Sequence, residues 1–228
     1  MEVDDVDLST NLLADTFGVW ECRSAGDFKV RVTNNFRANT ANEYAWMPSK
    51  LTYNGFSELK DALSAMKSVW SGELELGKSD FQAAFKTLPA AEGQGWLCWA
   101  LIYNTDEERH QVVPVQSQSF GSLGAVVAWH RTSCLLQTLM QSLFGLVVFS
   151  YVDDFFWVAP VDPISGVGAG WLQGFFRRVV SGLLGWQLDP SKDSYGSSVV
   201  LLGLEITSKL KLRAGASAPR KPKNGLRI

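Results

Sequence analysis

The chain has 228 residues, of which 46% are hydrophobic and 19% charged, so it can bury a sizeable core and does not have the composition of a disordered protein. Its 21 basic and 23 acidic residues give a formal net charge of -2, which argues against a protein that coats nucleic acid over its whole surface. The three cysteines are far apart and form no CxxC pair, which argues against a zinc or disulfide framework and favours reduced thiols.

The near-neutral charge averages two different parts of the chain. Residues 207–228 carry seven basic residues and no acid, which leaves 14 basic against 23 acidic residues, a net charge of -9, over residues 1–206. The N-terminus is acidic and lacks the apolar segment of a signal peptide, so an intracellular protein that is not secreted is expected, in the cytoplasm or the nucleus.

The first half of the chain predicts one helix and several short strands. An acidic lead-in, partly disordered, is expected over residues 1–25, with loose order over 1–18. Residues 26–37 alternate valines with polar residues and predict a strand or hairpin. Residues 57–70 predict a helix that Ser57 caps. A strand is then expected to end near Asp80. Two strands that pair with each other follow: a buried strand over 96–103 and its partner over 110–115.

The second half predicts a helix over 122–143 and then a strand, a turn and a strand over 146–152 and 155–159. The apolar run 135–152 is broken by Gln137 and Gln141, so it predicts a buried helix end, a break at Gly145 and a strand rather than a membrane span.

Residues 169–186 predict a second long amphipathic helix, with Arg177 and Arg178 on its solvent side. Two strand-like runs that could pair follow over 197–206 and 209–213, and a flexible tail ends the chain. The order of these elements indicates an α+β fold in which an antiparallel sheet is backed by helices.

Two acidic positions suggest a metal site. Asp153 and Asp154 are adjacent between apolar runs, where like charges resist joint ionisation unless a cation neutralises them. An ordinary Asp-Asp hairpin turn is the structural alternative. Asp80 follows another predicted strand, and acids that converge from two strand ends suit Mg²⁺. Two such ions can stabilise both oxygens of a phosphoryl displacement.

The chain resembles the reverse transcriptase family through blocks that occur in the family's order. The upstream KVRVTNNFR resembles a fingers block. The palm blocks are SDFQAAFKTLP at 79–89, QSFGSLGAVVAWHR at 118–131, YVDD at 151–154, GWQLDPSK at 185–192 and VVLLGLEI at 199–206.

This resemblance implies a polymerase palm with a ferredoxin-like core and a short fingers portion. Residues 26–78 would be partial fingers, 79–206 the palm, and 207–228 a basic strand and tail where a thumb would begin. The implied activity is RNA-directed DNA polymerisation in a retrotransposon. The implied partners are an RNA or DNA template with its primer, deoxynucleoside triphosphates and the rest of a retroelement polyprotein, with no membrane.

The resemblance also implies a role for each acid. Asp80 and Asp153 would bind two Mg²⁺ ions, for which Mn²⁺ could substitute, and the backbone carbonyl of Phe81 could be a further ligand. Asp154 would be a weaker ligand or an electrostatic support. Lys192 would protonate the leaving pyrophosphate, although a surface lysine is the alternative.

The implied nucleotide site lies partly upstream of the palm. Lys29 and Arg31 would hold the triphosphate, or would be an exposed strand face. Phe85 would exclude a ribose 2′-OH, or would be a core residue, and its bulk disfavours an RNA-templated RNA polymerase. The remaining implied residues are Gln118, Phe120, Gly121 and Tyr151 at the nucleotide, and Leu202 and Gly203 in the primer grip.

Several positions depart from the family pattern. Asn35 precedes Phe36 where the family has an acid, Ser119 replaces a proline, and Ala125-Val126 replaces Ala-Pro. Together with the net charge of -9, these departures keep two alternatives open. One is a truncated or decayed domain that binds nucleic acid or protein without synthesis, and the other is an unrelated α+β domain.

Overall fold

The computed structural model describes residues 7, 12–24, 27–47, 50–97, 99–209 and 212–214. They form two compact units, and the chain passes between the units after Leu51, Gln82 and His130. The predicted fingers and palm segments follow one another along the chain, whereas these units alternate. Most of the predicted lead-in before Leu13 and of the basic tail lies outside the described residues, as does Cys98.

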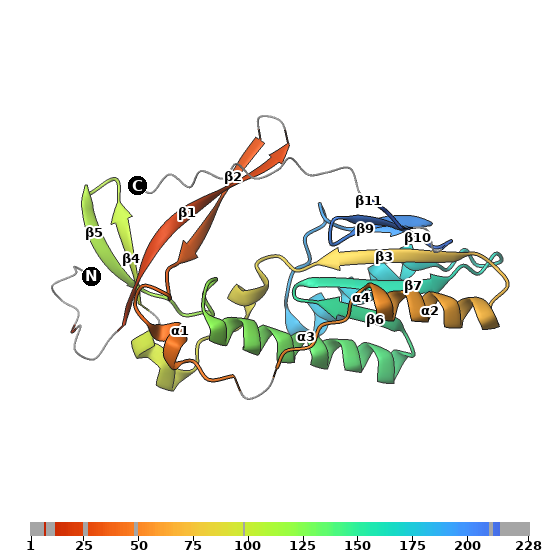
Figure 1. The fold of residues 1–228 in the computed structure, drawn as a ribbon, viewed down its shortest axis with the longest axis horizontal. Helices are drawn as coiled ribbons and strands as arrows, with labels where there is room; N and C mark the ends of the chain where they lie inside the picture. The colour runs from red at the N-terminus through yellow and green to blue at the C-terminus, as the bar shows by residue number, and fades with distance from the viewer. Residues whose placement is uncertain are drawn as a thin grey trace. The chain divides into compact units, whose positions relative to one another are not determined.

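The second unit is built on a four-stranded sheet in the order β6-β7-β3-β8, with antiparallel neighbours (Figure 1). Its strands are β3 (Leu74–Asp80), β6 (Val147–Tyr151), β7 (Asp154–Pro160) and β8 (Ser194–Gly196). Helix α3 (Leu123–Phe144) precedes β6, and helix α4 (Ala169–Leu184) joins β7 to β8. This chain order and strand order are ferredoxin-like. The prediction of an α+β fold with an antiparallel sheet backed by helices is therefore confirmed.

Both faces of this sheet are covered. Successive side chains of β7 point to opposite sides of the sheet, and those from Phe155 to Ala159 are all buried. Phe155 and Trp157 are fully buried on one side, with ring centroids 5.2 and 5.8 Å from that of Phe176 on α4. The opposite side contributes to a core formed by Leu59, Leu63, Leu74, Leu76, Phe156, Val158, Val199, Leu201 and Ile206. Only the two end residues of β7 are not buried, and Asp154 is one of them.

The helix predicted over 57–70 is confirmed as α2 (Phe56–Val69), but the predicted capping residue was wrong. Leu59 and Leu63 of α2 belong to the core on the side of Phe156 and Val158. The helix begins after Gly55, whose N–H donates to the Glu58 carboxylate over 2.7 Å. Ser57 instead donates its hydroxyl to Glu58 over 2.8 Å. A glycine offers no side-chain acceptor, so the acid three positions on supplies the cap.

The predicted strand over 197–206 is a tight hairpin. Strands β9 (Ser198–Leu201) and β10 (Leu204–Thr207) pair across Leu202 and Gly203, and β11 (Leu212–Ala214) pairs with β10. Both turn residues have left-handed φ values, +48° and +82°. Two-residue turns with positive φ match the twist of antiparallel strands, which explains the glycine.

The apolar run 135–152 forms the helix end, break and strand that were predicted. Helix α3 ends at Phe144, Gly145 has a φ of +64°, and β6 begins at Val147. Among the described residues, no helix combines the length and the apolarity that crossing a membrane would require.

The first unit contains a sheet in the order β2-β1-β4-β5. Its strands are β1 (Leu13–Ser24), β2 (Asp27–Asn34), β4 (Trp99–Asn104) and β5 (Arg109–Pro114), with β1 and β4 parallel and the other neighbours antiparallel. Helix α1 (Ala41–Tyr44) and two 3₁₀ helices, Ala84–Thr87 and Glu92–Leu97, complete it. Two expectations were wrong here: residues 13–18 belong to a strand rather than to a loose lead-in, and β4 is only partly buried.

Candidate active site

The three aspartates of the predicted metal site meet at one end of the central sheet. Asp80 is the last residue of β3 and pairs in register with Asp154, the first residue of β7. Partners directly opposite each other in an antiparallel pair share a face of the sheet, with Cβ atoms about 5 Å apart. Asp153 lies beside them in the two-residue turn between Tyr151 and Asp154. Val152, the first residue of this turn, has a left-handed φ of +55°.

These carboxyl groups influence one another electrostatically. Burial raises the pKa of Asp80 to about 6; the hydrogen bond from Lys192 opposes this rise, and the charges of Asp153 and Asp154 add to it. Burial and then the Asp153 charge likewise raise the pKa of Asp154. A desolvated group of like charges is costly to keep ionised, so this end of the sheet favours a cation.

Lys192 supplies one positive charge to this acidic group. Its ammonium group forms an ion pair with Oδ2 of Asp80. Burial alone would lower the pKa of Lys192, but the hydrogen bond to Asp80 and the charges of Asp80, Asp153 and Asp189 together raise it. The loop that carries Lys192 is tied to β3, because the Asp189 N–H donates to the Asp80 carbonyl over 2.8 Å.

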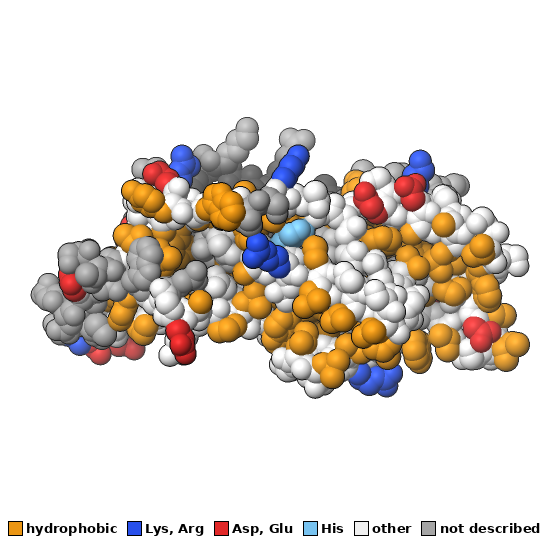
Figure 2. All heavy atoms as spheres, turned by 90° about the horizontal axis from the view of Figure 1, so that it is seen from below, with side chains coloured by type: hydrophobic (Ala, Val, Ile, Leu, Met, Phe, Trp, Pro, Cys, Tyr) orange, Lys and Arg blue, Asp and Glu red, His pale blue; other side chains and the backbone are white. Residues whose placement is uncertain are grey.

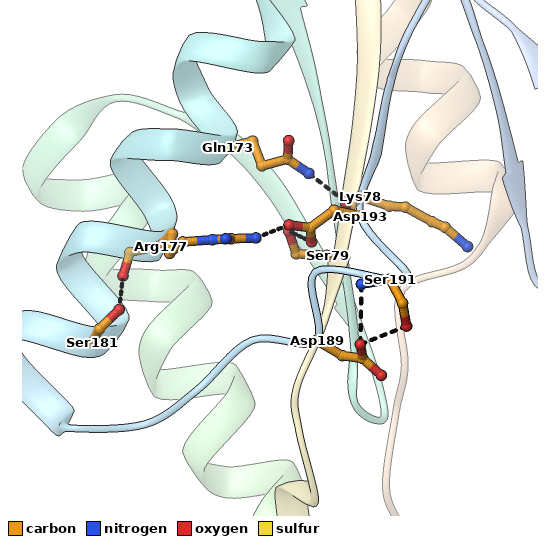
Figure 3. Close-up of polar contacts among 8 residues, drawn as sticks. All are labelled: Lys78, Ser79, Gln173, Arg177, Ser181, Asp189, Ser191 and Asp193. Carbon is orange, nitrogen blue, oxygen red and sulfur yellow. Dashed lines mark hydrogen bonds and ion pairs between the residues drawn. The ribbon is translucent and has the colours of Figure 1, made fainter.

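A second polar network holds the same loop on the other face of β3. The Ser79 hydroxyl donates to Asp193 over 2.6 Å, and the guanidinium of Arg177 on α4 forms an ion pair with the same carboxylate. Figure 3 shows Arg177 and Gln173 extending from α4 toward β3, where the Gln173 amide donates to the Lys78 carbonyl over 3.2 Å. Sequence reasoning missed Asp193, and it assigned Arg177 to the solvent side, although Arg177 is partly buried in this ion pair.

The residues at this end of the sheet fit a hard cation. Oδ1 of Asp80 is buried and has no hydrogen-bond partner within the part of the chain that is described. A buried oxygen without a partner is costly, and a divalent ion would satisfy it. However, no three His, Cys, Asp or Glu side chains of the described residues already form a ready-made metal cluster. The donor set is suitable, but the ammonium group of Lys192 already forms an ion pair with Oδ2 of Asp80.

The aromatic residues beside the acids have different environments. The Phe81 ring is buried, with centroids 5.4 Å from Phe155 and 6.1 Å from Trp186. Tyr151 is partly exposed, and its ring centroid lies 5.3 Å from that of Tyr53. Phe81 therefore anchors the end of β3 in the core, whereas Tyr151 remains accessible at the hairpin.

The first unit brings together most of the residues predicted to bind nucleotide. The guanidinium carbon of Arg31 lies 5.3 Å from the ring centroid of Phe120, and the Phe85 centroid lies 5.5 Å from the same ring. Phe85 also contacts the buried Trp129, with centroids 6.4 Å apart, so it contributes to a core as well. Cation–π and edge-to-face contacts thus join three of the predicted residues.

Gly121 occupies a position that only glycine can fill. It has a φ of +106°, and a Cβ atom there would lie 2.4 Å from the Asn34 carbonyl oxygen. Sequence reasoning missed Asn42, whose amide donates to the Gly121 carbonyl over 2.9 Å and accepts the Leu123 N–H over 2.8 Å. Asn42 therefore joins this loop to the start of α3, through partners about 80 residues away in sequence.

Two further predicted nucleotide residues have simpler surroundings. Lys29 is exposed on β2, two residues before Arg31, so both side chains project from the same face of the strand. Gln118 pairs through its backbone N–H with the Leu88 carbonyl over 2.8 Å. The three aspartates and Lys192 belong to the second unit. The first unit contains Lys29, Arg31, Phe85, Gln118, Phe120 and Gly121.

The fold is similar to that of a known polymerase. Among solved structures, the chain matches a foamy viral protease-reverse transcriptase in complex with an RNA/DNA hybrid, with a TM-score of 0.55 and 16% sequence identity. The match covers 86% of this chain and 22% of the viral chain, so this chain spans about a fifth of that protein's length. The chain therefore has a reverse-transcriptase-like fold. No family model matches the sequence, and no curated protein matches it.

Proposed function

We propose that this chain is the polymerase palm, with partial fingers, of a retroelement reverse transcriptase. It would transfer a nucleotide from a deoxynucleoside triphosphate to a primer 3′-OH under the direction of an RNA template. The observation that carries the proposal is the pairing of Asp80 with Asp154 beside Asp153, together with the unsatisfied Oδ1 of Asp80. Two Mg²⁺ ions, or Mn²⁺ in their place, are the proposed cofactors.

In this reaction the primer 3′ oxygen forms a bond to the α-phosphorus, and the bond from that phosphorus to the bridging oxygen of the pyrophosphate breaks. The bound ions would lower the pKa of the 3′-OH and stabilise charge on the leaving pyrophosphate. Asp80, Asp153 and Asp154 would hold them, with the Phe81 carbonyl as a further ligand. Much of the remaining rate enhancement would come from holding both substrates in line.

Lys192 would act in two ways. Without ions its ammonium group neutralises Asp80, as the ion pair between them indicates. In the loaded enzyme it would give a proton to the leaving pyrophosphate, since a lysine ammonium group is protonated at neutral pH.

The first unit would supply the nucleotide contacts. Arg31 and Lys29, which share one face of β2, would bind the triphosphate. Phe85, Gln118, Phe120 and Gly121 would line the sugar and base, and Tyr151 is a further proposed nucleotide contact. The Leu202–Gly203 turn would hold the primer strand.

Primer extension tests this function most directly. With poly(rA)/oligo(dT) and Mg²⁺, the wild type should extend the primer, whereas Asp80→Asn and Asp153→Asn should reduce the rate by at least about a thousandfold. Asp61→Asn, which removes an exposed acid from α2, is the matched control and should be fully active. Equal extension by the wild type and Asp153→Asn would contradict the proposal.

A domain that binds without synthesis is the second candidate. The net charge of -9 over residues 1–206 favours it, because phosphate contacts supply much of the affinity for nucleic acid and an acidic body would hold a primer–template too poorly for synthesis. Figure 2 shows one face of the molecule with many hydrophobic and few Lys or Arg side chains. Binding of a labelled RNA/DNA hybrid or of a partner protein, with no extension under any metal condition, would favour this candidate.

A further inference from the structure

Gln137 on α3 gathers an unusual number of hydrogen bonds at the edge of the central sheet. Its side-chain oxygen accepts the Ser150 N–H over 3.0 Å, the Ser150 hydroxyl over 2.8 Å and the Asn54 amide over 2.8 Å. Asn54 also reaches the Ser150 carbonyl, at 3.4 Å. Ser150 is buried, with 3% of its surface exposed, so these groups depend on one another rather than on water.

The position of Ser150 explains why it needs such partners. Among the described strands, β6 lies at the edge of its sheet, so no strand pairs with the backbone groups on its outer side. Gln137 and Gln141, one helical turn apart on α3, take that place. Gln141 donates to the Val148 carbonyl over 2.7 Å, and Gln137 accepts the N–H of Ser150, two residues further along the strand.

The two glutamines differ in their distance from the candidate metal site. Ser150 directly precedes Tyr151 and lies three residues before Asp153, whereas Val148 lies deeper in the strand. If the bonds at Ser150 are lost, the last pair of β6 is held only by β7, and the left-handed turn at Val152 lies immediately beyond it.

We propose that Gln137 is a positioning residue that orders the Tyr151–Asp154 hairpin and thereby places Asp153, an inference that rests on the proposed metal site. Gln137 would act through its bonds to Ser150 rather than by contacting substrate or ion. Hydrogen-bonded groups behind metal ligands commonly change metal affinity or activity by about 10- to 100-fold when they are removed.

The test compares Gln137→Leu with Gln141→Leu, because each removes one amide from α3 and keeps a side chain of similar size. Gln137→Leu should speed hydrogen exchange of the amides at residues 151–154 by about tenfold, whereas Gln141→Leu should leave them unchanged. Gln137→Leu should also raise the Mn²⁺ concentration needed for half-maximal thermal stabilisation, and lower kcat, by about tenfold or more. KM for the deoxynucleotide should change little in both variants.

A third variant separates positioning from folding. Gln137→Glu keeps the acceptor oxygen, so it should restore slow exchange at the hairpin and a kcat near that of the wild type. Equal hydrogen exchange at 151–154 in Gln137→Leu and Gln141→Leu would overturn the inference. If the wild type neither responds to Mn²⁺ nor extends a primer, the proposed function is lost, but hydrogen exchange still decides whether Gln137 orders the hairpin.

Discussion

Asp80 and Asp154 lie directly opposite each other across the β3–β7 ladder, so two carboxyl groups share one face at the end of a buried sheet. Like charges in this relation destabilise an antiparallel pair. The ammonium group of Lys192 offsets part of this repulsion through Asp80. Such an arrangement reduces the stability of the metal-free fold, and the stability should recover when a divalent cation binds.

The pH dependence of stability should reveal this cost. The pKa of Asp80 is about 6 in the folded chain, whereas a carboxyl group in an unfolded chain titrates near 4. Between these values the folded state binds more protons, so stability should fall as the pH rises from about 4 to about 6. Relative to Asp80→Asn, the loss should be about 1–2 kcal/mol after allowance for screening by solvent. Urea unfolding in EDTA at several pH values measures this loss. If the stabilities of the wild type and Asp80→Asn changed with pH in parallel, the raised pKa of Asp80 would be contradicted.

The ion pair between Arg177 and Asp193 should be needed for stability. Arg177→Met leaves the Asp193 carboxylate, which is 11% exposed, with the bond from Ser79 as its remaining side-chain partner among the described residues, so the free energy of unfolding should fall by about 1–3 kcal/mol. Arg178→Met, on the exposed side of the same helix, should change it by less than about 0.5 kcal/mol. Chemical denaturation measures both, and similar losses would show that the ion pair adds little.

Gly77→Ala and Gly182→Ala should change the free energy of unfolding in opposite directions, because Gly77 is closely packed and Gly182 is not. A Cβ atom at Gly77 would lie 2.2 Å from the buried Trp157 indole, so Gly77→Ala should destabilise the fold by about 1–3 kcal/mol. Gly182 on α4 has open space around its Cα atom, and Gly182→Ala should stabilise the helix by about 0.5–1 kcal/mol. Thermal unfolding of the two variants gives the signs, and a stabilising Gly77→Ala would mean that Trp157 can move.

Phe85 should select the sugar of the incoming nucleotide if the proposed function is correct. Phe85→Ala should raise the ratio of ribonucleotide to deoxynucleotide incorporation by about 10- to 100-fold, because the space for a 2′-OH opens. The variant will also lose packing against Trp129, so the ratio of incorporation rates, rather than the absolute rate, is the measurement. Phe28→Ala, at an exposed aromatic on β2, is the control. An unchanged ratio with a lower melting temperature would leave Phe85 as a core residue only.

Local patterns predicted the elements whose signals are local. Apolar runs and the Asp-Asp turn were sufficient to predict β6, β7 and the end of α3. Gly145 indicated the break between the helix and the strand. Strand β1 was missed because the acidic residues at the start of the chain resembled a solvated lead-in. The local pattern over 197–206 predicted a continuous strand, and the turn at Leu202–Gly203 was indicated only by the resemblance to the primer grip.

The contacts that organise the candidate site could not be read in this way. Ser79 meets Asp193 across 114 residues, and Lys192 meets Asp80 across 112. Such pairs depend on the register of three strands, which a single sequence does not specify. Gln137 and Gln141 were noticed only as interruptions of an apolar segment, and their bonds to β6 follow from its place at the sheet edge.

Val152 directly precedes Asp153 and keeps a left-handed backbone that a β-branched residue rarely adopts. Such a conformation costs about 1–3 kcal/mol, and glycine would adopt it without that cost. Glycine would also give the turn more backbone freedom, whereas the stiff valine side chain restricts it. Selection for thermal stability would therefore favour glycine at position 152, whereas selection for a fixed position of Asp153 would favour valine.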